Sequence, residues 1–140
     1  MNQPVNKFIG HAFFLLSTLL ASLSASASAL IDHVTVDTHD QQEEVRIYFT
    51  QPVFYLYHTP DKIVKSTLIG LRTNLSGRPD SRTYHNTITT GPSKYITDME
   101  IFSEAGFNTH LYIQFKKSVN VTVRTGPQLR SIIIKLTPDL

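Results

Sequence analysis

Three side chains in one short segment have the types that bind metal ions: His33, Asp37 and His39. Their odd positions would place them on one face of an extended strand. A strand rises about 3.3 Å per residue, so His33 and His39 would lie roughly 20 Å apart, whereas zinc ligands lie about 2 Å from the ion. Asp40 could join Asp37 and His39 only if a turn began at Thr38. We therefore interpret the segment as a solvated polar face that continues into a loop, and expect no metal site.

The other candidates for catalysis are also scattered. His58, His85 and His110 fall on different expected strands, and no sequence pattern sets one of them beside a nucleophile. The chain contains no Gly-x-Ser-x-Gly, no His-Glu-x-x-His and no phosphate-binding glycine loop. Asp98 and Glu100 share a strand face, but glycoside hydrolysis needs carboxylates on both sides of the scissile bond. We therefore expect a non-enzymatic protein without a cofactor, with a small metal-binding or hydrolytic protein as an alternative.

The N-terminal segment has the three parts of a secretory signal peptide. Lys7 supplies positive charge, an apolar stretch covers residues 8–23, and small residues follow it. Alternating alanines allow cleavage after Ala27 or Ala29. A membrane-spanning helix needs about 20 mostly apolar residues, and this stretch is shorter. The segment therefore predicts export from the cytoplasm.

Removal of a signal peptide over 1–29 leaves residues 30–140, which is enough chain for one domain with a core. The absence of cysteine excludes disulfides and a lipid-modified cysteine at the cleavage site, and a cysteine-free exported domain favours a bacterial periplasm. The 13 lysines and arginines against 11 acidic residues give no general attraction for nucleic acid. We expect a soluble periplasmic domain with no lipid anchor, no nucleic-acid partner and no membrane insertion after cleavage.

The mature sequence predicts strands throughout and no substantial helix. Apolar and polar residues alternate over 45–50, 111–116 and 119–124, which is the period of a half-buried strand. The segments 53–57 and 132–136 are more continuously apolar, which favours strands covered on both faces.

The two ends of the mature sequence resemble each other at an offset of 65 to 67 residues. The matching stretches are 31–36 with 96–101, 45–49 with 111–115, and 53–57 with 119–123. Each half, 30–71 and 96–137, would form a four-stranded unit, and the two units follow each other at a spacing of about 65 residues. Two such units predict an all-β sandwich of two symmetry-related sheets.

Two sets of polar side chains are candidate binding residues. The first occupies outward positions of an expected hairpin in the second half and the turn beyond it: Tyr112, Gln114, Lys116, Arg124 and Arg130. An aromatic ring, an amide and guanidinium groups suit a polyanionic or sugar-peptide polymer, because arginine presents its donors to carboxylates in a fixed geometry. An ordinary solvated sheet face is the alternative.

The second set lies in the basic segment 72–95 that joins the halves: Arg72, Arg78 and Arg82. We expect this segment to be a surface loop with one short strand around 84–89. A connection of this length is uncommon in a compact domain and often functional.

The spacing of the strand residues resembles a known family. The first half reads Ile-x-x-Val-x-Val, a polar loop, then Val-x-Ile-x-Phe-x-x-Pro-Val, and the second half ends Val-x-Val-Arg-Thr-Gly-Pro-x-Leu-Arg-Ser-Ile-Ile-Ile-x-Leu. From about Ile31 to Leu136 the chain is similar to the AMIN and AMIN-like domains of bacterial envelope proteins. The resemblance implies a β-sandwich of two symmetric sheets, a periplasmic location and targeting through peptidoglycan or other envelope components. It implies no catalytic residues.

Domains of this family usually sit beside an amidase, a secretin or a repeat region, none of which this sequence contains. We therefore expect binding in trans, or a fragment of a larger protein. The first expectation for function is recognition of peptidoglycan or of an envelope assembly. The alternative is a protein–protein adaptor of an envelope secretion or pilus machine, whose partner pairs with an exposed sheet edge.

Overall fold

The computed structural model describes residues 30–73, 83–103 and 108–140. The predicted signal peptide, 1–29, therefore lies outside the described residues. The elements of the described part are β1 (Ile31–His39), β2 (Gln42–Phe49), β3 (Phe54–Asp61), β4 (Ser66–Arg72), β5 (Tyr84–Thr87), β6 (Ile96–Ser103), β7 (Thr109–Phe115), β8 (Val119–Thr125), the 3-10 helix η1 (Pro127–Leu129) and β9 (Ser131–Pro138). Nowhere in these three ranges is a helix long and apolar enough to cross a membrane.

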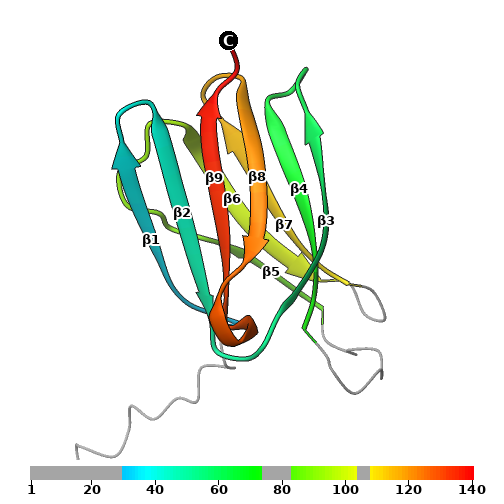
Figure 1. The fold of residues 1–140 in the computed structure, drawn as a ribbon. Coiled ribbons are helices and arrows are strands. Elements are labelled where there is room, and N and C mark those ends of the chain that lie inside the picture. Colours follow the sequence, from blue (N-terminus) through cyan, green and yellow to red (C-terminus); the bar gives the residue numbers. More distant parts are fainter. Residues whose placement is uncertain (1–29, 74–82, 104–107) are drawn as a thin grey trace, which may run out of the picture.

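The strands form two antiparallel sheets that face each other (Figure 1). One sheet has four strands in the order β1-β2-β9-β8, and the other has five in the order β3-β4-β7-β6-β5. The expected all-β sandwich is confirmed, and the short strand expected within the joining segment is β5. Both sheets bury one face and expose the other, which explains the alternating sequence pattern.

The chain changes sheets twice, between β2 and β3 and between β7 and β8. The expected hairpin over 111–124 is therefore wrong, because its two strands belong to different sheets. The β1–β2 and β3–β4 hairpins carry a residue in the left-handed region at the turn, Asp40 (φ 53°) and Lys65 (φ 54°), as is common in tight turns. The connection 116–118 has no such residue among those described. Alternation within strands is the same for a hairpin and a crossing, so it could not separate them.

The pairing registers match the repeat in the sequence. In the four-stranded sheet Val45 pairs with Ile134, and in the five-stranded sheet the residues at the repeat offset, Leu111 and Ile69, also pair. The register shift at the start of β1, between Ile31 and His33, has its counterpart between Ile96 and Asp98 in β6. The two-fold relation of the halves stays a prediction, which these registers support.

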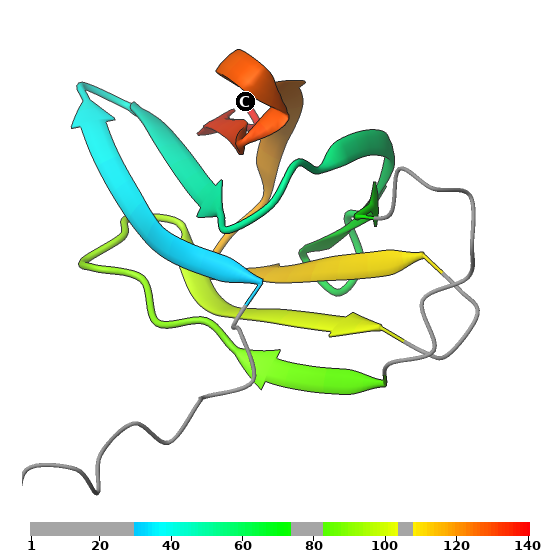
Figure 2. The same cartoon turned by 90° about the horizontal axis from the view of Figure 1, so that it is seen from below.

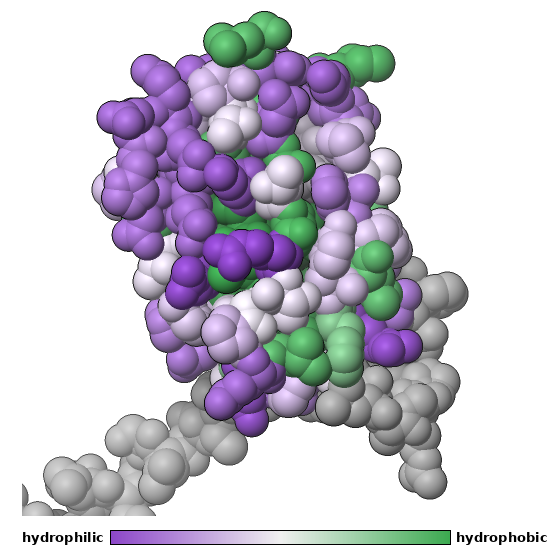
Figure 3. All heavy atoms as spheres, viewed as in Figure 1, coloured by the Kyte–Doolittle hydropathy of each residue, from purple (hydrophilic) through white to green (hydrophobic). Residues whose placement is uncertain are grey.

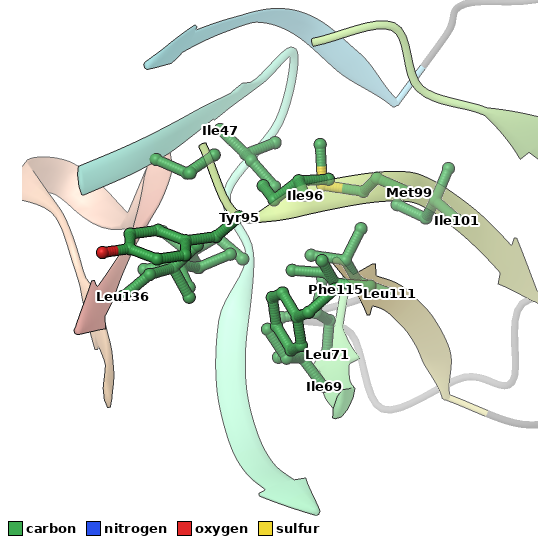
Figure 4. Packing of buried hydrophobic residues seen from close by; sticks show 14 of the residues in the cluster. Ile47, Ile69, Leu71, Tyr95, Ile96, Met99, Ile101, Leu111, Phe115 and Leu136 are labelled. Atoms are coloured by element: carbon green, nitrogen blue, oxygen red, sulfur yellow. The ribbon is translucent and has the colours of Figure 1, made fainter. Parts of the chain in front are cut away.

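The core fills the space between the sheets. Its fully buried aliphatic side chains come from inward positions of both sheets: Val45, Ile47, Ile69, Leu71, Leu111, Ile113, Ile132, Ile134 and Leu136. Figure 4 shows Tyr95, from the segment before β6, packed among them beside Leu136. The expectation that 53–57 is covered on both faces is wrong, because β3 is an edge strand whose Leu56 and Tyr57 are exposed.

A buried carboxylate fastens the segment before β6 to the four-stranded sheet. Glu43 of β2 points inward and is completely buried. Its Oε1 accepts a hydrogen bond from the Ser93 hydroxyl, and its Oε2 accepts from the Lys94 backbone N–H (2.8 Å) and the Thr38 hydroxyl (3.5 Å). These bonds hold Tyr95 in position for its burial.

Candidate functional site

One row of side chains crosses the outer face of the five-stranded sheet from edge to edge. Pairing is continuous from Tyr57 of β3 to Gly70 of β4, His110 of β7, Phe102 of β6 and His85 of β5. Gly70, His110 and Phe102 lie at outward positions, since their neighbours Ile69, Leu111 and Ile101 are buried in the core. Tyr57 and His85 pair directly with Gly70 and Phe102 and so share their face. We call the four ring-bearing residues of this set the aromatic row.

The rings of the aromatic row contact one another in sequence. The Tyr57 hydroxyl shares a hydrogen bond with His110 Nε2 (3.1 Å), and the His110 ring stacks on Phe102 with centroids 5.4 Å apart and planes 26° apart. His85 meets Phe102 edge-on, with centroids 6.1 Å apart, and its Nε2 donates to the Glu100 carboxylate at 2.9 Å. The contacts fix the ring orientations while the face stays accessible: Tyr57 is 41% exposed.

Gly70 allows the Tyr57 ring to lie close to the backbone of β4. A Cβ built on Gly70 would lie 2.5 Å from Cε1 of the Tyr57 ring, well inside van der Waals contact. The Tyr57 ring therefore lies directly on the backbone of β4. Any larger residue would lift the ring away from the sheet.

Polar groups surround the aromatic row on the same face. Tyr112 and Gln114 follow His110 at outward positions of β7, and Tyr112 pairs with Glu100 of β6. On the other side of the row, Arg72 lies two residues beyond Gly70 and its guanidinium sits over the Phe54 ring at 5.2 Å. The face thus combines flat rings with a carboxylate, an amide and a cation.

The outer face of the four-stranded sheet has a different chemistry. At the repeat offset, the positions of Tyr57, Gly70, His110 and Phe102 are occupied by Thr122, Lys135, Glu44 and Asp37, which also pair in one row. Figure 3 shows that hydrophilic side chains predominate on this face. Four strands of each sheet pair in the corresponding order, so along these strands the difference between the two faces lies in the side chains.

Charged groups on the four-stranded face pair with each other. Arg46 donates to Glu44 (3.0 Å) and to the Tyr48 hydroxyl (3.5 Å), and Arg124 lies 3.8 Å from Glu44. The Tyr48 hydrogen bond first, and Glu44 second, raise the pKa of Arg46.

The sequence-predicted binding residues divide between these places. The structure brings Tyr112, Gln114 and Arg72 together on the five-stranded face, and puts Arg124 on the opposite one. Two others contact backbone at the ends of the sandwich.

Those two are Lys116, which donates to the Ser93 carbonyl (2.8 Å), and Arg130, which donates to the Thr50 carbonyl (2.7 Å). Both contacts tie a connection to its neighbour, so these side chains serve the fold. Arg78 and Arg82 lie outside the described residues.

Sequence reasoning missed the aromatic row itself. Tyr57 and His110, which contact each other, are 53 residues apart in the sequence, and the row is assembled only through four strand pairings. The one available signal was an aromatic or histidine at an outward position of each of several strands. Reading it requires the strand order and register, which alternation alone does not give.

A cavity of about 440 Å³ lies between the edge strands β1 and β5. Its wall includes apolar side chains of Ile31, Val34, Ile88 and Ile101, and its rim includes Asp32. Within the described ranges, no group of three or more histidine or acidic side chains is placed to hold a metal ion.

No protein-family model, no curated protein and no solved structure matches this chain. The resemblance to AMIN domains stays a prediction.

Proposed function

We propose that this protein is a non-enzymatic binding domain of the bacterial cell envelope, and that the aromatic row binds the glycan chains of peptidoglycan. The observation that carries the proposal is the continuous row of Tyr57, His110, Phe102 and His85 on one outer face. An extended, accessible row suits a linear polymer better than a compact ligand, which would need a concave pocket.

The chemistry of a sugar chain fits the row. The face of an aromatic ring carries partial negative charge, which attracts the polarised C–H groups on the flat side of a pyranose ring. Glu100, Gln114 and the Tyr112 hydroxyl lie beside the rings and can exchange hydrogen bonds with sugar hydroxyl and amide groups.

A cation beside the row suits the peptide part of peptidoglycan. Peptide stems carry carboxylates, and the guanidinium of Arg72 offers them two parallel donors. Arg72 is exposed and held over the Phe54 ring, so little side-chain freedom is lost on binding. The export signal predicted over 1–29 would bring the domain to this polymer.

A pull-down with purified peptidoglycan tests the proposal. Phe102→Ala combined with Tyr57→Ala removes two rings. If each ring contributes as much as an aromatic side chain does when a nucleic-acid base stacks on it, about 1–3 kcal/mol, the dissociation constant should rise at least about tenfold. The matched control is Asn120→Ala with Thr122→Ala, which removes two exposed side chains of β8 in the other sheet, and should bind like the unmodified protein.

Two results would contradict the proposal. One is an unmodified protein that fails to sediment with peptidoglycan, and the other is equal loss of binding in both double variants. Circular dichroism of each variant checks that its fold is intact.

A further inference from the structure

We propose that β1 pairs antiparallel with β1 of a second copy of this chain, which joins two four-stranded sheets into one eight-stranded sheet. The pairing surface is the free edge of the four-stranded sheet and does not include the aromatic row. The proposal is therefore independent of peptidoglycan binding, and either can fail without the other.

The first observation is that β1 is a long edge strand, and beyond the bulge between Ile31 and His33 it pairs regularly with β2 over residues 33–39. It has nine residues, stands at the end of its sheet and contains no proline, lysine or arginine. Edge strands are normally short, or protected by such residues, because their unpaired N–H and C=O groups invite another strand. By contrast, the edge strand β3 contains Pro60 and β5 has only four residues.

The second observation is that the chain itself adds a strand at the equivalent edge of the other sheet. By the repeat offset, β1 corresponds to β6, and β5 pairs antiparallel with β6 from Ser103 to Glu100. The corresponding stretch of β1, residues 35–38, has no such strand among the described elements. By analogy with β6, the edge of β1 is placed to pair with an antiparallel strand.

The backbone of β1 decides which residues would make the new hydrogen bonds. The Phe49 N–H of β2 donates to the Arg130 backbone carbonyl (2.9 Å). The backbone N–H and C=O groups of Phe49 therefore point toward β9, and those of its neighbour Tyr48 point toward β1. The backbone groups of His33, which pairs with Tyr48, therefore point toward β2. Groups alternate along a strand, so the N–H and C=O groups of Val34 and Val36 face the open edge.

One register suits both faces of the new pair. If the two-fold axis passes through Thr35, Val34 of one copy lies opposite Val36 of the other, and both point inward. On the outer face, His33 of each copy lies opposite Asp37 of the other. An axis through Val34 or Val36 instead sets Thr35 opposite His33 or Asp37, so the contact between His33 and Asp37 is lost. An axis through Asp37 sets Asp37 opposite Asp37, and like charges directly opposite each other are unfavourable.

The side chains at the edge are suited to this register. His33 is held flat on Tyr48, with ring centroids 4.1 Å apart, and its Nδ1 bonds to Asp32 at 2.8 Å. These contacts orient the ring and leave Nε2 for Asp37 of the second copy; that bond forms with the imidazolium, in which both ring nitrogens donate. Asp37 is exposed, as the register requires.

The cavity beside β1 gives the inward side chains somewhere to pack. It is lined by Ile31, Val34, Ile88 and Ile101, and β1 and the segment after β5 lie along the same side of the sandwich (Figure 2). A strand added to β1 would extend over this side. Val36 of the second copy, which lies opposite Val34, would cover apolar surface there.

Sedimentation equilibrium of the purified protein, from micromolar to millimolar concentration, tests the proposal. We expect a monomer–dimer equilibrium. Thr35→Lys sets two lysines opposite each other at the two-fold axis and should raise the dissociation constant at least about tenfold. Thr122→Lys is the matched control, because Thr122 is an exposed threonine on β8, the edge strand at the other end of the same sheet; it should dimerise like the unmodified protein.

The register is tested by exchange of charge. Asp37→Lys should weaken the dimer, and adding His33→Asp should restore it, because the new aspartate of each copy then lies opposite the new lysine of the other. A protein that stays monomeric to millimolar concentration overturns the proposal and leaves the edge to a different partner. So does a dimer that Thr35→Lys does not weaken. Asp37→Lys and Thr35→Lys change exposed side chains, so folding should be retained.

Discussion

Replacement of Glu43 by glutamine should destabilise the fold far more than its small change in shape suggests. Glu43 is buried, and its two oxygens accept from two different donors, the Ser93 hydroxyl and the Lys94 N–H. Ser93 has no freedom to reverse its role, because its oxygen already accepts from the N–H groups of Tyr95 (3.2 Å) and Ile96 (2.9 Å). Glutamine has one acceptor oxygen and one donor amide, so in either orientation a donor meets a donor.

The size of the effect follows from that contact. A buried donor without an acceptor costs about 1–3 kcal/mol. Glutamine removes the desolvation cost of a buried charge, but this gain does not supply the missing acceptor. For a domain of this size, a loss of 1 kcal/mol lowers the melting temperature by about 4–8 °C, so we expect Glu43→Gln to lower it by roughly 5–20 °C.

Thermal unfolding followed by circular dichroism measures the fall in melting temperature, and urea unfolding measures the loss of unfolding free energy. The control is Glu44→Gln on the next residue, whose partly exposed carboxylate pairs with Arg46 on the outer face; surface pairs contribute about 0–1 kcal/mol. Equal stability of the two variants would refute the assignment of Glu43 as the acceptor that fastens the segment before β6. A Glu43→Gln variant as stable as the unmodified protein would refute it as well.

Two further changes test other parts of the structure. Gly70→Ala places a methyl group 2.5 Å from the Tyr57 ring, so the exposed ring should swing away; peptidoglycan binding should fall several-fold while the melting temperature changes little, and unchanged binding would show that the flat ring is not needed. The Lys62 ammonium, and then the Ser118 hydroxyl, hold the pKa of Asp139 below its usual 3.8, so the stability they contribute is present above that pH and is lost as the pH falls through the lower, folded-state pKa. Between pH 5 and pH 2, urea unfolding should therefore show a smaller loss of unfolding free energy for Asp139→Asn than for the unmodified protein. Equal losses would show that Asp139 does not contribute to the acid sensitivity.

The fold class followed from the sequence because burial of one sheet face imposes a period of two. The alternation over 45–50 corresponds in the structure to Val45, Ile47 and Phe49, all buried on the inner face of β2. The same argument failed for 53–57, where an apolar run lies on an edge strand and part of it is exposed. Composition reports how apolar a strand is, but its neighbours decide what covers it.

The candidate site was only partly predictable for the same reason. Tyr112 and Gln114 could be assigned to an outward face from their own strand. Their expected neighbour Arg124 lies on the other sheet, and their real neighbours Glu100 and Phe102 come from β6. Which strands lie side by side depends on whether a short connection turns back or crosses over, and residues 116–118 carry no signal that decides it.

The two proposals trace to one departure from the internal repeat. Of the strands in the five-stranded sheet, β5 has no counterpart among the described strands of the other sheet. It contributes His85 to the end of the aromatic row, and it covers the edge of β6. Without a counterpart of β5, the edge of β1 is left open. The strand β5 therefore distinguishes the two sheets in two ways. It adds the His85 ring to the aromatic row, and it covers the edge of β6, while the described part of the other sheet leaves the edge of β1 for pairing with a second copy.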